Sequence, residues 1–162
     1  MQIKYLGKEK FDVRSKEARI ELGYQVSING FPLPGPGEYE KSGISIEGIA
    51  DNGNTIYVIR ADEINLCYLG KISHDLREEE AKEIGDVDIL FIPLGEDGSL
   101  PTKKALGLVS KIDPKVVIPM LYSDLMEFKK SEGITNGETE VLKIKKSELP
   151  EEELMNVILK AS

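Results

Sequence analysis

The chain has 162 residues, of which 40% are apolar, so it can bury one substantial core but is too short for two ordinary domains. We therefore expect a single domain over residues 1–162. The 29 acidic and 21 basic residues give a formal net charge of -8, which argues against nucleic acid as a partner. The apolar runs are far shorter than a membrane span, and the first residues resemble a strand rather than a secretion signal. We expect a soluble cytoplasmic protein that does not bind membranes.

Short strands dominate the first 70 residues. Six segments alternate apolar and polar residues, or run apolar, between Gly, Asn and Asp breaks, which is typical of consecutive strands: 1–7, 16–23, 24–29, 43–50, 54–61 and 63–70. Asn52-Gly53 is a favourable two-residue hairpin turn between two of them. Residues 30–40, GFPLPGPGEYE, contain three prolines and three glycines and are interpreted as a rigid turn that enters the next strand.

Helices and buried strands alternate in the second half. A charged segment at 76–84 ends at Gly85 and predicts a short exposed helix, and the apolar run 86–94 predicts a buried strand. A second helix is indicated by apolar residues at helical spacing, namely Ala105, Leu108, Val109 and Ile112. The run 115–120 predicts another buried strand, and a third, shorter helix follows around Leu125 and Phe128.

The C-terminal segments 139–145 and 154–161 read as two further strands, which could pair with each other or with another subunit. Together these elements predict an α/β layered domain with a strand-rich N-terminal half.

The residues that usually support metal or nucleophilic chemistry are scarce. A catalytic zinc ion needs about three ligands drawn mainly from His, Cys and carboxylates, and this chain has one histidine, His74, and one cysteine, Cys67. Cys67 lies among apolar neighbours and is expected to be a buried, inert thiol, and as the only cysteine it excludes an internal disulfide. His74 has no visible acid partner and is expected to cap or bridge backbone near the first helix. We expect no cofactor.

Several stretches, in order along the chain, resemble the metallo-β-lactamase-fold hydrolases, in particular the branch that includes the ascorbate-phosphate lactonases. They are YLGKEKF at 5–11, PGPGEYEKSGISIEGIA at 34–50, NTIYVIRADEINLCYLGKISHDL at 54–76, GDVDILFIPLG at 85–95 and IDPKVVIPMLYSD at 112–124. The resemblance implies a shortened metallo-β-lactamase-like αβ/βα sandwich, with the family's dinuclear metal site at one edge of its sheets.

At the positions that the resemblance assigns to metal ligands, this chain departs from the family pattern. Lys8 and Leu121 stand where relatives have histidines, and Tyr68 and Lys71 stand where relatives have a histidine and a bridging aspartate. The family's HxHxDH segment has no counterpart, because the short stretch 23–30 occupies its interval. Lysine and leucine cannot hold a divalent metal, so the Lewis acid that would activate water is expected to be missing.

We therefore expect a non-catalytic member of the family that acts as a binding or assembly module. Loss of the ligand segment should uncover apolar surface suited to self-association or to a protein partner. In an alternative, Lys8 and Lys71 place positive charge where the metal ions were and bind a small anion. In a third hypothesis the chain is a hydrolase with a carboxylate-only magnesium or manganese site built from Asp88, Glu96, Asp97 or Asp124.

Overall fold

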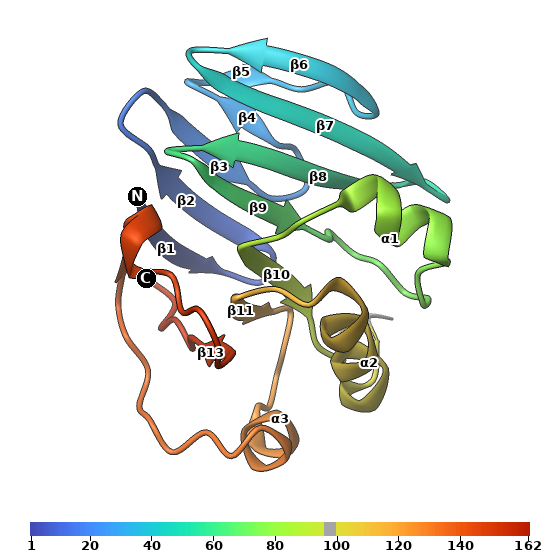
Figure 1. The fold of residues 1–162 in the computed structure, drawn as a ribbon, viewed down its shortest axis with the longest axis vertical. Coiled ribbons are helices and arrows are strands. Elements are labelled where there is room, and N and C mark those ends of the chain that lie inside the picture. Colours follow the sequence, from blue (N-terminus) through green and yellow to red (C-terminus); the bar gives the residue numbers. More distant parts are fainter. Residues whose placement is uncertain (96–99) are drawn as a thin grey trace.

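Two β-sheets packed face to face form the body of the protein (Figure 1). The computed structural model describes residues 1–95 and 100–162. Within these residues the first sheet has six strands in the order β12 (Leu142–Lys143), β1 (Gln2–Gly7), β2 (Lys10–Arg14), β3 (Arg19–Leu22), β4 (Ser27–Ile28) and β5 (Phe31–Pro32). The second has seven, in the order β13 (Met155–Asn156), β11 (Val116–Met120), β10 (Ile89–Pro93), β9 (Ile64–Tyr68), β8 (Asn54–Ala61), β7 (Ile44–Asp51) and β6 (Gly37–Lys41).

The helices add a third layer on the far side of the second sheet. They are α1 (Glu78–Ile84), α2 (Thr102–Ile112) and α3 (Met126–Ser131), with a short 3-10 turn at Lys146–Glu148. The buried residues of all three helices join the apolar cluster on the outer face of the second sheet, whereas a separate cluster fills the space between the sheets. Strands β10 and β11 are therefore covered on both faces, which explains why every one of their residues is buried.

The outer face of the first sheet carries charges instead of a helix layer. Alternation along β1, β2 and β3 places apolar residues in the core and polar residues outside. Asp12 lies at the centre of this face, with its carboxylate 2.6 Å from Nε of Arg19 and 3.1 Å from Nε of Arg14. Burial acts to raise the pKa of Asp12, but the hydrogen bonds from the two arginines outweigh it and the pKa lies below its usual value.

Most of the predicted elements are confirmed, including all three helices and the hairpin turn. Asp51 pairs with Asn54 across a two-residue turn, in which Asn52 and Gly53 both have positive φ, 47° and 84°. These are the angles that a type I′ turn requires and that Asn-Gly adopts readily. No helix of the described residues is long and apolar enough to cross a membrane.

Other predictions need correction. Strand β2 was not predicted, and the segment 30–40 is not one rigid turn, because it contains β5 and the first residues of β6. The two C-terminal segments belong to different sheets: β12 pairs antiparallel with β1, and β13 pairs parallel with β11. Their direct pairing with each other is limited to an isolated bridge between Thr139 and Leu159.

Aromatic packing between the sheets supplies a test of the core. Phe91 on β10 is fully buried, and its ring centroid lies 4.7 Å from that of Phe11 on the opposite sheet. We expect Phe91→Ala to lower the free energy of unfolding by about 3–5 kcal/mol, because truncation leaves a cavity between two sheets that cannot collapse freely. The matched control is Met126→Ala, since Met126 is 72% exposed and its truncation should change stability by less than about 0.5 kcal/mol. Urea denaturation measures both; equal effects of the two changes would contradict this description of the core.

Candidate functional site

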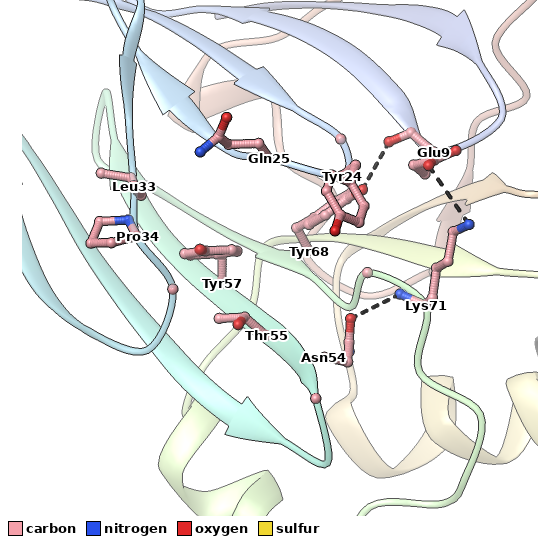
Figure 2. Close-up of a pocket in the computed structure, with 14 residues that line it drawn as sticks. Glu9, Tyr24, Gln25, Leu33, Pro34, Asn54, Thr55, Tyr57, Tyr68 and Lys71 are labelled. Atoms are coloured by element: carbon pink, nitrogen blue, oxygen red, sulfur yellow. Dashed lines mark hydrogen bonds and ion pairs between the residues drawn. The ribbon is translucent and has the colours of Figure 1, made fainter.

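A pocket of about 570 Å³ opens at the end of the sandwich where β7 and β9 finish (Figure 2). Its walls come from the β1–β2 turn, the β3–β4 loop, the β5–β6 loop, the β7–β8 hairpin and the residues that follow β9. The β3–β4 loop lies within the stretch 23–30, where the resemblance expects a longer ligand segment. The pocket thus lies beside the shortened part of the chain.

The structure brings together, around the β1–β2 turn, the four positions that the resemblance assigns to metal ligands. The Tyr68 hydroxyl donates to the carbonyl of Glu9 at 2.9 Å, and the Lys71 ammonium lies 3.8 Å from the Glu9 carboxylate. The backbone N–H of Leu121 donates to the carbonyl of Lys8 at 2.9 Å. All four predicted positions therefore lie close together, and hydrogen bonds and an ion pair between protein groups connect them.

Only two of these four side chains line the pocket, those of Tyr68 and Lys71. The Lys8 side chain is exposed and lies outside the lining, while its carbonyl accepts hydrogen bonds from Leu121 and from the Tyr5 hydroxyl, the latter at 2.7 Å. Lys8 and Leu121 both adopt left-handed backbone angles, with φ of 54° and 55°. Lys8 thus contributes to the site mainly through its main chain.

The residues at these positions do not fit a metal ion. Protonated lysine and leucine have no lone pair to donate, and Leu121 is buried among apolar groups. Burial, together with the nearby charge of Glu9, raises the pKa of Tyr68 well above its usual value and keeps its phenol protonated. In the part of the chain that the structure describes, no group of three or more His, Cys, Asp or Glu residues is arranged to hold a metal.

The carboxylates considered for a carboxylate-only site are engaged elsewhere or lie outside the described residues, as Glu96 and Asp97 do. Asp88 precedes β10, at the end opposite to the pocket, where it accepts a hydrogen bond from the Asn65 N–H and lies 3.3 Å from the Lys146 ammonium. Asp124 follows β11 and accepts the N–H of Met126 at 2.8 Å at the start of α3. The two carboxylates therefore lie at opposite ends of the second sheet.

Cys67 is a buried thiol, as predicted. It lies on β9 with no exposed surface, and burial raises its pKa to about 12. A thiol with such a pKa carries almost no thiolate near neutral pH and is a poor nucleophile.

His74 has an acid partner, contrary to the sequence-based expectation. Its Nε2 lies 2.5 Å from a carboxylate oxygen of Asp51, and its Nδ1 lies 2.6 Å from the carbonyl of Asp75. The carbonyl of Asp75 and the carboxylate of Asp51 raise the pKa of His74, because both favour an imidazolium that donates from both nitrogens. Sequence spacing does not reveal this pair, because 23 residues separate its members and they meet only through the pairing of β7, β8 and β9 in one sheet.

Asn54 is a site residue that the sequence-based reasoning missed. Its side-chain amide donates to the carbonyl of Leu69 at 2.9 Å and to Asp51 at 3.3 Å, and its oxygen accepts the N–H of Lys71 at 3.1 Å. A side chain at Gly70 would place its Cβ 2.5 Å from the Asn54 oxygen, so this close approach requires glycine. Asn54 thereby fixes the backbone that carries Lys71.

Comparison with known proteins identifies the family to which this chain belongs. The model of the family described as "Beta-lactamase superfamily domain" matches residues 13–121, more than half of the chain, and the chain belongs to this family. No curated protein sequence matches it.

Among solved structures, a candidate Zn-dependent hydrolase of the metallo-beta-lactamase superfamily from Thermotoga maritima is similar over 98% of both chains, with 20% identity and a TM-score of 0.79. Igni18, a metallo hydrolase from Ignicoccus hospitalis, is similar over 89% of this chain and 99% of its own, with 16% identity and a TM-score of 0.64. At these identities the similarity shows the fold, which confirms the shortened metallo-β-lactamase-like sandwich.

The His74–Asp51 pair predicts a pH dependence of stability. Because the folded-state pKa of His74 is raised, the pair stabilises the protein fully below the unfolded value of about 6.5 and loses this effect as pH rises through the folded value. We expect the difference in melting temperature between wild type and His74→Gln to be largest near pH 6 and to shrink towards pH 9, as measured by thermal melts across this range. Among the described residues, the charged groups that interact with His74 are Asp51, Asp75 and Glu80, all acidic, so none reverses this sign. A difference that does not change with pH would contradict the pairing.

The backbone role of Lys8 predicts that its side chain is dispensable. A left-handed conformation costs an ordinary residue about 1–2 kcal/mol, and glycine avoids that cost. We expect Lys8→Gly to raise stability by about 0.5–1 kcal/mol, whereas the control Lys10→Gly, at an exposed position in β2, should lower it by a similar amount. Chemical denaturation of both variants decides the matter: a destabilised Lys8→Gly protein would show that the lysine side chain contributes.

Proposed function

We propose that this chain is a non-catalytic member of the metallo-β-lactamase-fold superfamily that binds a small molecule, without a metal ion, in the pocket at the end of the sandwich. The observation that carries the proposal is the pocket itself. Its volume of about 570 Å³ falls in the range typical of small-molecule sites. Its lining combines tyrosine rings with a few polar and charged groups, which is the usual composition of a recognition site.

The chemistry of the neighbouring residues supports a binding role over a hydrolytic one. Metal-assisted hydrolysis needs ligands that hold an ion and lower the pKa of bound water, and Lys71 and Leu121 cannot act as such ligands. Cys67 is buried in the apolar cluster beneath the helices and has a raised pKa, and His74 is bonded to Asp51; neither residue lines the pocket. Neither residue therefore supplies the pocket with a nucleophile or a general base.

Self-association through uncovered apolar surface has weaker support. The large apolar side chains that are exposed in the described residues come from several separate elements: Leu6, Tyr24, Phe31, Met126, Leu154 and Met155. Scattered exposure of this kind is normal for a protein surface and does not by itself indicate an interface.

A small anion is the second candidate ligand, favoured by the half-exposed ammonium of Lys71 at the pocket, although Lys8 does not join it there.

Two measurements test the proposal together. Elemental analysis of protein purified without chelators should find no stoichiometric zinc, iron or manganese, and EDTA should leave the melting temperature unchanged. A library of small molecules screened by NMR should yield binders whose chemical-shift changes map to Tyr24, Thr55 and Lys71. Thr55→Trp fills the pocket and should abolish these shifts, whereas the same change at Thr139, which does not line the pocket, should preserve them.

Firmly bound metal at one equivalent would overturn the non-catalytic assignment. Binders that map away from the pocket, or that survive Thr55→Trp, would overturn the assignment of the site.

A further inference from the structure

The charges that line the pocket balance one another. Within the described residues the lining has one cation, Lys71, and one anion, Glu9, with 3.8 Å between ammonium and carboxylate. A phosphate or carboxylate ligand would be attracted by Lys71 but repelled by the carboxylate of Glu9 beside it. The chain as a whole, with a net charge of -8, would also repel such an anion. An uncharged ligand is repelled neither by Glu9 nor by the net negative charge of the chain.

The Glu9 carboxylate has unused capacity to accept hydrogen bonds. Its side chain is only 11% exposed, and the Lys71 ammonium at 3.8 Å lies beyond hydrogen-bond distance. The Tyr68 hydroxyl donates to the Glu9 carbonyl and so leaves the carboxylate oxygens untouched. A largely buried carboxylate has room for several donors, and adjacent hydroxyl groups of a ligand would supply them without adding charge.

Tyrosine rings form the rest of the recognition surface. Tyr57 and Tyr68 lie in the pocket wall, and Tyr24 stands at the β3–β4 loop with 94% of its surface exposed (Figure 2). Aromatic rings of this kind offer apolar faces at a low cost in conformational entropy. A hydroxylated ring compound can place its C–H face against such a ring while its hydroxyl groups point to polar residues.

The polar wall is held in place before any ligand binds. The side chain of Asn54 is fully engaged by Leu69, Asp51 and Lys71, so it holds the hairpin and the residues after β9 in one arrangement. A wall fixed in this way lowers the ordering cost of binding.

From these four features we infer that the pocket binds an uncharged, polyhydroxylated ring compound, such as a monosaccharide or a cyclitol. Glu9 accepts hydrogen bonds from adjacent hydroxyl groups, Lys71 donates to a third oxygen, and Tyr24 covers the apolar face of the ring. This assignment rests on the proposed function of the pocket and names the class of ligand.

The test is an NMR titration of the full chain with D-glucose, D-ribose and myo-inositol, compared with D-glucose 6-phosphate and glycine. We expect saturable shifts at the pocket residues for at least one neutral compound, which should bind more tightly than the phosphorylated sugar or the zwitterion. Glu9→Gln should weaken neutral binding about tenfold and, by freeing Lys71, should raise the affinity for D-glucose 6-phosphate. Glu21→Gln, on the outer face of the first sheet, should change neither affinity.

Tyr24→Ala provides a second variant in case Glu9→Gln does not fold, because so exposed a side chain contributes little to the core. It should weaken neutral binding at least fivefold, whereas Phe31→Ala, which truncates another exposed aromatic residue outside the pocket, should leave it unchanged. Tighter binding of the phosphate or of glycine would overturn the neutral class while leaving a binding pocket in place. The same holds if the general library binds there and all polyols fail; if nothing binds in the pocket, both proposals fail.

Discussion

Two backbone carbonyls in the β1–β2 turn hold the open end of the sandwich together. The carbonyl of Lys8 accepts hydrogen bonds from Tyr5 and Leu121, and that of Glu9 accepts one from Tyr68. Leu121 and Tyr68 belong to the second sheet and its loops, so these bonds link the sheets where the resemblance places metal ions. A buried carbonyl that lost such a partner would cost about 1–3 kcal/mol, so each bond constrains the distance between the sheets. The bond between Tyr68 and Glu9 thereby fixes one wall of the pocket.

The polarity of the two outer faces explains how a chain of 162 residues forms a layered fold with helices on one side only. An outer face of a sheet must be covered, or it must be polar. The outer face of the first sheet is polar, because Asp12 pairs with Arg14 on its own strand and with Arg19 on the neighbouring strand β3, which keeps that face compatible with water. The apolar residues of the chain are then concentrated in two clusters, between the sheets and beneath the helices. The described helices are needed only for the second cluster.

The elements that the sequence predicts well are those with a local signal. The helical spacing of Ala105 to Ile112 and the Asn52-Gly53 turn depend on neighbouring residues alone, and both are confirmed. Strand β6 was missed because the prolines just before it indicated a turn. The same distinction applies to the site. The resemblance indicated Tyr68 and Lys71, but their contacts with Glu9 span some 60 residues and depend on how the two sheets pack against each other. The acid partner of His74 was missed for the same reason.

Left-handed backbone at Lys8 and Leu121 connects the fold to the site. Two ordinary residues in this region cost together about 2–4 kcal/mol, which glycines at both positions would remove. Such conformations persist only where the surrounding contacts determine them, and here the bond from the Leu121 N–H to the Lys8 carbonyl joins the two strained residues directly. The turn that carries Glu9 is therefore rigid, and Asn54 fixes the backbone of Lys71 in the same way. With these parts of the pocket fixed, the half-exposed side chain of Lys71 is the part best able to adapt, so a ligand of the proposed class would be selected by its fit to a preformed surface.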